Sequence, residues 1–121
     1  MAQCERLICS SDELLDTGKG VRFSLRLGDR DEPAFTIRFH GRAFGYLNRC
    51  GHVPVELDWQ PGEFFDYSGK YLICATHGAL YAPESGRCVS GRCNGKGLQQ
   101  LQVAEHDGQL FLIEEGDSGG G

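Results

Sequence analysis

The sequence contains no long hydrophobic run and no excess of positive charge, and each absence excludes a class of protein. No stretch approaches the roughly 20 apolar residues that a membrane-spanning helix needs. Residues 1–6 lack the basic segment followed by an apolar one that marks a secretory signal, so we expect a cytoplasmic protein. Acidic residues number 17 against 12 basic ones, a formal charge of −5, which argues against a nucleic-acid-binding surface.

Helical periodicity, internal repeats and nucleotide-binding fingerprints are also missing. Apolar residues at helical spacing are scarce, and only residues 12–16 could form a single turn. No flavin or nicotinamide fingerprint is present, which argues against a protein that binds either cofactor. At 121 residues the chain is long enough for one modest core and too short for a second, catalytic domain.

Strand patterns, by contrast, are easily recognised. Residues 21–27 and 35–39 alternate apolar and polar side chains, and a two-residue turn, His40-Gly41, joins the second segment to residues 42–47. Further strands are expected at residues 71–73, 98–103 and 110–113, the last two joined through Asp107-Gly108. The 18 glycines suit a fold with many tight turns. We therefore predict a mostly antiparallel, all-β fold, followed by a flexible tail at residues 114–121.

Two short cysteine–histidine pairs carry the chemistry. Cys50-Gly51-His52 is followed, after 21 residues, by Cys74-Ala75-Thr76-His77. Together they supply two thiolates and two imidazoles, enough for a four-ligand metal site. Structural zinc also takes two Cys and two His, but its usual spacing keeps like ligands together within each pair. Mixed pairs suit a two-iron cluster, in which each loop must reach both irons; the spacing alone leaves zinc open.

Both pairs, with their flanking residues, resemble the ligand loops of the Rieske family. The likeness includes residues 48–52, residues 74–81 and the turn at residues 83–87, and it extends over roughly residues 20–113. It implies a [2Fe–2S] cluster held by Cys50, His52, Cys74 and His77, with Gly78, Ala79 and Tyr81 close by. It also implies a Rieske-like antiparallel β sandwich or barrel with a small cluster-binding subdomain. The domain would span residues 1–113, with the ligand loops within about residues 48–83.

Departures from the family pattern indicate which kind of member this is. High-potential respiratory members carry an additional disulfide-forming cysteine in each ligand loop and a serine at the place of Ala79; this chain has neither. Tyr81 matches a position whose hydroxyl bonds a ligand cysteine's sulfur in those proteins. Residues 90–93 occupy the place of a covering loop, with Arg92 where proline is usual. The resemblance therefore implies a soluble, low-potential, ferredoxin-like member.

The expected function is one-electron transfer, from a reductase to an oxygenase, by a carrier that is not itself an enzyme. Two other functions stay open: a redox-sensing module and a structural zinc module. Neither a membrane nor a nucleic acid is expected among the partners.

Several remaining residues also carry expectations. Of the other cysteines, Cys4, Cys9, Cys88 and Cys93, we expect free thiols rather than a Cys88–Cys93 disulfide, because cytosolic disulfides are uncommon. His40 and His106 are expected to be exposed and outside the site. Four acids between the ligand loops are expected to surround the electron exit and attract a basic partner: Glu56, Asp58, Glu63 and Asp66.

Overall fold

The computed structural model describes residues 3–27, 29–49, 56–58, 60, 62–74, 78–91 and 97–115. This part of the chain forms ten strands and one short 3-10 helix, and contains no helix that could span a membrane. The elements are β1 (Gln3–Ser10), η1 (Ser11–Glu13), β2 (Val21–Leu27), β3 (Arg30–Phe39), β4 (Arg42–Leu47), β5 (Leu72–Ile73), β6 (Leu80–Tyr81), β7 (Cys88–Ser90), β8 (Gln100–Leu101), β9 (Val103–His106) and β10 (Gln109–Glu115).

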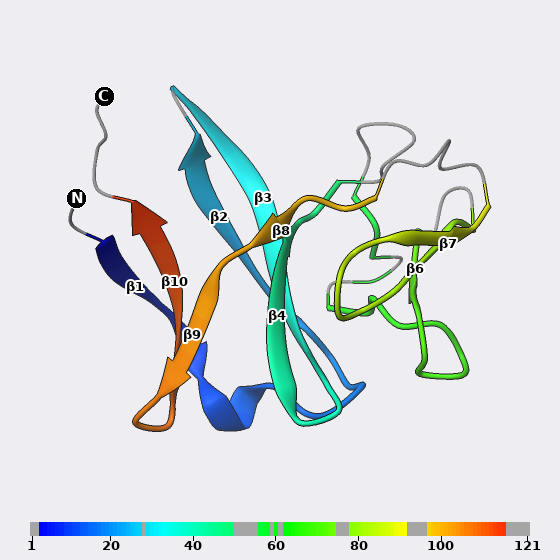
Figure 1. Ribbon diagram of the computed structural model, residues 1–121, viewed down its shortest axis with the longest axis horizontal. Coiled ribbons are helices and arrows are strands. Elements are labelled where there is room, and N and C mark those ends of the chain that lie inside the picture. Colours follow the sequence, from blue (N-terminus) through cyan, green and yellow to red (C-terminus); the bar gives the residue numbers. More distant parts are fainter. Residues whose placement is uncertain are drawn as a thin grey trace.

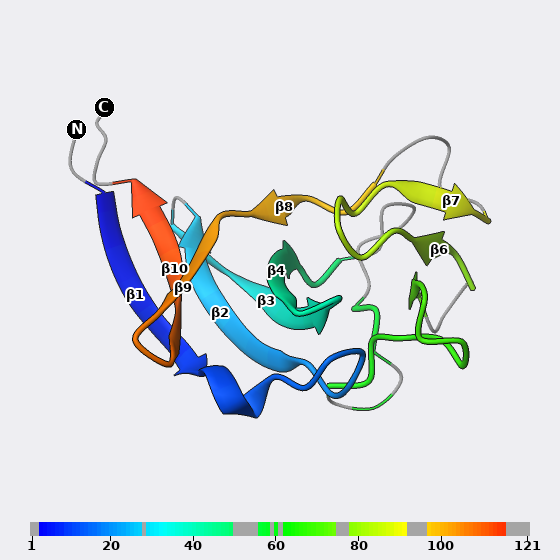
Figure 2. The same cartoon turned by 60° about the horizontal axis from the view of Figure 1, so that its bottom comes forward.

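These strands form three antiparallel sheets. Their orders are β1-β10-β9, β2-β3-β4-β8 and β5-β6-β7. Figures 1 and 2 show the four-stranded sheet in the middle, the β1-β10-β9 sheet at one end and the small β5-β6-β7 sheet at the other. The predicted all-β, antiparallel fold with a small subdomain is confirmed.

The β2–β3–β4 meander follows from sequence alternation and one tight turn. His40 and Gly41 both have positive φ, 53° and 79°, which is the geometry of a hairpin turn whose twist matches the flanking strands. Strands β2 and β4 have the predicted bounds, but β3 begins five residues earlier than expected, at Arg30. Apart from Ala34, the added residues are charged or proline, so they do not have the alternation that predicts a strand. Pro33 nevertheless pairs in register with Ser24, although proline is uncommon within strands.

The terminal sheet contains the one long strand that the sequence pattern missed. Strand β1 pairs with β10, and its register shifts between Leu7 and Cys9, which pair with Phe111 and Leu110. This bulge places three successive apolar residues, Leu7 to Cys9, in one strand and destroys the alternation that would have revealed it. Strand β10 also runs two residues beyond the predicted end, to Glu115. The rest of the predicted tail, residues 116–121, lies outside the described residues.

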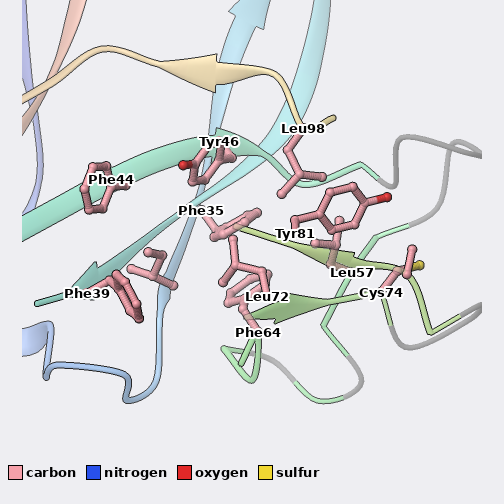
Figure 3. Close-up of a cluster of buried hydrophobic side chains, with 12 residues drawn as sticks. Phe35, Phe39, Phe44, Tyr46, Leu57, Phe64, Leu72, Cys74, Tyr81 and Leu98 are labelled. Atoms are coloured by element: carbon pink, nitrogen blue, oxygen red, sulfur yellow. The ribbon is translucent and has the colours of Figure 1, made fainter. Parts of the chain in front are cut away.

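One hydrophobic cluster joins the central sheet to the small subdomain. It includes Phe35 and Tyr46 from β3 and β4 and Phe64, Leu72 and Tyr81 from the subdomain side, all fully buried (Figure 3). The rings of Phe35 and Phe64 stack with their centroids 3.9 Å apart and their planes 11° from parallel. The subdomain is therefore anchored on the core of the larger sheet rather than on a core of its own.

Candidate metal centre

Of the four predicted ligands, only Cys74 lies within the described residues. Cys50, His52 and His77 lie outside them, so the ligand set stays a prediction. Within the described part of the chain, no group of three or more His, Cys, Asp or Glu side chains could hold a metal ion. The structure does show the framework from which both ligand loops extend.

The second loop is the tip of a small hairpin. Strand β5 leads into Cys74, and β6 begins at Leu80. The N–H of Cys74 donates to the carbonyl of Ala79 at 2.9 Å, and the N–H of Gly78 donates to the carbonyl of Cys74 at 2.7 Å. Gly78 has a φ of 73°, a left-handed conformation that glycine adopts without strain. The turn that closes the loop therefore favours glycine at residue 78.

Cys74 has the surroundings expected of a cluster ligand. The residue is fully buried and is not disulfide-bonded. Figure 3 shows its sulfur at the same end of the hydrophobic cluster as the hydroxyl of Tyr81, which is also fully buried. A thiolate in such an apolar position needs a cation for charge compensation, and a metal provides one. A deprotonated Cys74 would therefore fit a metal site here; the second predicted ligand of this loop, His77, lies outside the described residues.

Strand β7 ends against the second loop. Gly91, directly after β7, has a φ of 98°, and a Cβ placed on it would lie 2.8 Å from the Cα of Ala79. Ala79 is itself fully buried. Although Arg92, which replaces the usual proline, lies outside the described residues, the backbone just before it packs tightly on the second loop.

The first loop is framed by a contact that the sequence pattern did not predict. Asn48, two residues before Cys50, is 1% exposed. Its side chain accepts a hydrogen bond from the N–H of Leu57 at 2.8 Å and donates one to Asp58 at 3.1 Å. The only sequence signal for this contact is an asparagine close to a predicted ligand.

The prediction that Asp58 belongs to an exposed acidic rim is wrong. Its side chain is only 2% exposed, with Oδ1 bonded to Asn48 and Oδ2 to the N–H of Gly62 at 3.1 Å. Glu56 is exposed but forms an ion pair with Arg22 at 2.8 Å. A docking role for Glu56, Glu63 and Asp66 stays a prediction.

The expectation of a free thiol at Cys88 is also wrong. Cys88 is disulfide-bonded. Because Cys9 and Cys74 are not in disulfides, its partner is one of the cysteines whose side chains the structure does not describe, Cys4, Cys50 or Cys93. The prediction failed because it relied on the general rarity of cytosolic disulfides, which says nothing about the local surroundings of one cysteine.

The two other histidines are exposed, as expected. His40 stacks on Phe39 with a centroid distance of 4.0 Å, and His106 contacts Glu5 and Asp107 through its two ring nitrogens. Both lie at turns of the larger sheets rather than in the small subdomain.

A family comparison settles what kind of centre this framework carries. The model of the Rieske [2Fe-2S] domain matches residues 5–110. The chain belongs to the Rieske [2Fe–2S] family. Its cofactor is accordingly a [2Fe–2S] cluster, which supplies one-electron redox chemistry when bound. The match disfavours structural zinc.

Solved structures share the fold at low sequence identity. The ferredoxin of carbazole 1,9a-dioxygenase from Nocardioides aromaticivorans IC177 has 14% identity and a TM-score of 0.68, covering 92% of this chain and 98% of its own. A ferredoxin from Sphingomonas yanoikuyae B1 has 17% identity and a TM-score of 0.71, covering 93% of this chain and 100% of its own. The terminal oxygenase from the same Nocardioides strain has 20% identity and a TM-score of 0.72, covering 94% of this chain but 31% of its own. No curated protein sequence matches significantly.

Proposed function

We propose that this Rieske protein is a ferredoxin, which carries single electrons from a reductase to an oxygenase-type partner and catalyses no reaction itself. We also propose a cytoplasmic location. Its partners would be redox proteins rather than membranes or nucleic acids, consistent with the formal charge of −5.

The extent of the structural match carries this proposal. The Nocardioides ferredoxin aligns over 98% of its length, whereas the terminal oxygenase aligns over only 31%. A further similar structure, 17% identical with a TM-score of 0.71, comes from a complex of reduced oxygenase and oxidised ferredoxin in carbazole 1,9a-dioxygenase and aligns over 97% of its own chain. The likeness thus extends over a whole carrier and only over one part of an enzyme.

Direct electron-transfer measurements test the proposal. We expect the purified protein to be red-brown, to titrate as a one-electron couple, and to pass its electron to the terminal component of a Rieske oxygenase in a stopped-flow experiment. A cluster-free variant, Cys74→Ser, serves as the control. A colourless protein that contains zinc, or a reduced cluster that no such oxygenase oxidises, would contradict the carrier function.

The four ligands are proposed from their place in the sequence. Cys50 and Cys74 would bind one iron, and His52 and His77 the other. His77→Ala should prevent stable cluster assembly, because a site short of one ligand cannot complete its coordination. Iron and acid-labile sulfide contents measure this, with His40→Ala, at a turn of the central sheet, as a matched control. Full iron and sulfide in His77→Ala would contradict the assignment.

The disulfide at Cys88 favours redox sensing as a second candidate function. Cys88 pairs in register with Tyr81, so it lies on the strand beside the hairpin that carries Cys74. A sensor would change its cluster or its partner when dithiothreitol reduces this bond to two thiols. A midpoint potential and a partner affinity that are equal before and after reduction would contradict it.

The domain limits likewise remain our proposal. The sequence predicts a Rieske domain at residues 1–113 and a tail at residues 114–121; because β10 runs to Glu115, we propose that the domain ends at residue 115 and that the tail without packing comprises residues 116–121. Removing residues 116–121 should leave the unfolding midpoint and the cluster content unchanged.

A further inference from the structure

We infer that Asn48 and Asp58 form a buried clamp that positions the first ligand loop and so determines how firmly the cluster is held. The inference rests on the proposed assignment of Cys50 and His52 as ligands. It adds a role for two residues that bind no iron themselves.

The clamp joins the two ends of the loop through one side-chain amide. Oδ1 of Asn48 accepts a hydrogen bond from the backbone N–H of Leu57 at 2.8 Å. Nδ2 of Asn48 donates to Oδ1 of Asp58 at 3.1 Å. Since Asn48 precedes the two predicted ligands and Leu57 follows them, these contacts fix the distance between the loop's entrance and its exit.

Asp58 connects the clamp to the rest of the fold. Its second carboxylate oxygen, Oδ2, accepts a hydrogen bond from the N–H of Gly62 at 3.1 Å and lies 3.5 Å from Nε of Arg22 on β2. Both carboxylate oxygens therefore have partners, as a carboxylate that is only 2% exposed requires. A buried carboxylate is costly to place, and its full set of partners points to a specific geometric role.

Both ends of the clamp are also held by backbone contacts. The N–H of Asn48 donates to the carbonyl of Pro33 on β3 at 2.8 Å, and the N–H of Gly20 donates to the carbonyl of Gly62 at 2.8 Å. Arg49, between Asn48 and Cys50, forms an ion pair with Glu32 on β3. The loop's ends are therefore fixed to the central sheet, and the Asn48–Asp58 contact joins these two fixed points.

Fixed ends should matter for iron retention. Residues that orient metal ligands without touching the metal typically change metal affinity by about 10–100-fold when mutated. A loop whose ends can separate should release its cysteine and histidine more readily. Loss of the clamp is therefore expected to accelerate cluster loss.

An exchange of the two side chains tests the clamp itself. Asn48→Asp brings two carboxyl groups together. In Asp58→Asn, the NH₂ group of the new amide must face another donor, either the NH₂ group of Asn48 or the N–H of Gly62. In the double variant, Asn48→Asp with Asp58→Asn, the hydrogen bond between the two side chains reverses direction. The new carboxylate at position 48 then accepts from Leu57 and from the new amide at position 58, whose own oxygen accepts from Gly62, so every donor again has an acceptor.

The measurement is the rate at which visible cluster absorbance disappears in the presence of a chelator. We expect each single variant to lose its cluster about tenfold faster than the wild type or more, and the double variant to return to within about threefold of the wild-type rate. Arg26→Gln, which removes an exposed pair with Asp31 at 3.7 Å on the same strand as Arg22, should behave as the wild type.

A second control separates positioning from general stability. Leu112→Ala, in a core cluster of the β1–β10 side, should lower the unfolding midpoint of the metal-free protein without the same acceleration of cluster loss. Three results would overturn the clamp. The single variants could lose their cluster at the wild-type rate, or the double variant could lose it as fast as the worse single variant. In the third, Leu112→Ala would accelerate cluster loss as much as the single variants do for the same fall in unfolding midpoint. A wild-type protein that takes up no cluster would instead overturn the ligand assignment on which the clamp rests.

Discussion

At the scale of single residues, we expect His106 to make the stability of the terminal sheet depend on pH. Its Nε2 lies 3.0 Å from Glu5 of β1 and its Nδ1 lies 3.0 Å from Asp107, while its ring stacks on Phe111 of β10. Hydrogen bonds that the ring donates to the carboxylates of Asp107 and then Glu5 raise the pKa of His106 above its ordinary value. The protonated ring thus connects the two outer strands of the sheet across β10.

The direction of the pH effect follows from that raised pKa. The stabilisation is complete below the pKa of the unfolded chain and is lost as pH rises through the higher pKa of the folded protein. His106→Gln should therefore lower the thermal midpoint more at about pH 5.5 than at about pH 8.5. His40→Gln, at a histidine stacked on Phe39, is the control. An equal loss at both pH values would show that the ion pair contributes nothing to stability.

The cysteines should differ sharply in reactivity. Burial, followed by the charge of Glu13, raises the pKa of Cys9 to about 11, so its thiol stays protonated and inert at neutral pH. Cys88 should resist alkylation until it is reduced, because it is disulfide-bonded. We predict Cys93 as its partner, because only four residues separate the two. Peptide mapping without reduction identifies the pair, and a bond from Cys88 to Cys50 would contradict the ligand set.

The spacing of residue types predicts a ligand set, which stays a prediction, but it did not predict the contacts of the residues around that set. Two Cys–His pairs can be recognised in the chain because their spacing is local. Asp58 lies in an acidic stretch and has the sequence pattern of a surface residue. Its burial depends on Arg22 and Asn48, which come from other parts of the chain, and no local pattern records that they meet.

At the scale of elements, the contact between β7 and the second ligand loop should be sensitive to added volume. Gly91→Ala combines a positive φ of 98° with a Cβ placed 2.8 Å from the Cα of Ala79. Left-handed strain costs about 1–2 kcal/mol and overpacking about 1–3 kcal/mol. We expect a loss of about 2–5 kcal/mol in the free energy of unfolding by urea, together with a changed cluster spectrum.

Gly108→Ala is the matched comparison. Gly108 has a similarly positive φ of 73°, but no atom of the described residues lies within 4 Å of a Cβ placed on it. Only the strain of about 1–2 kcal/mol should remain, and the cluster spectrum should not change. Equal losses for the two variants would mean that the second loop yields to the added methyl group.

Elements were predictable where a turn or an alternation is local. Both hairpin turns, His40-Gly41 and Asp107-Gly108, have the positive φ values that their sequences suggest. Strand β1 could not be recognised, because its bulge interrupts the alternation and its partner, β10, lies at the opposite end of the chain. Strand β5 falls within residues 71–73, where the sequence pattern predicts a strand, whereas β6, with only two residues, is too short to have a period and was not predicted as a strand.

At the scale of the whole molecule, the reduction potential combines the cluster's surroundings with the charge of the protein. Reduction adds one negative charge, so hydrogen bonds to the cluster's sulfurs favour the reduced form, and the formal charge of −5 opposes it. Ala79 offers no hydroxyl, and its backbone is already closely covered by Gly91. We expect a midpoint near the bottom of the Rieske range of roughly −150 to +300 mV.

A restored hydroxyl tests that reasoning. Ala79 is fully buried, so a serine there must find an acceptor within the protein or at the cluster. A hydrogen bond to a charged group contributes about 1.5 kcal/mol, close to a tenfold change in equilibrium, or about 59 mV for one electron. Ala79→Ser should therefore raise the midpoint by roughly 60 mV in protein-film voltammetry, with Ala82→Ser, beyond β6, as the control. A wild-type midpoint in the upper half of the range would contradict the low-potential assignment, and a downward shift in Ala79→Ser would contradict its physical cause.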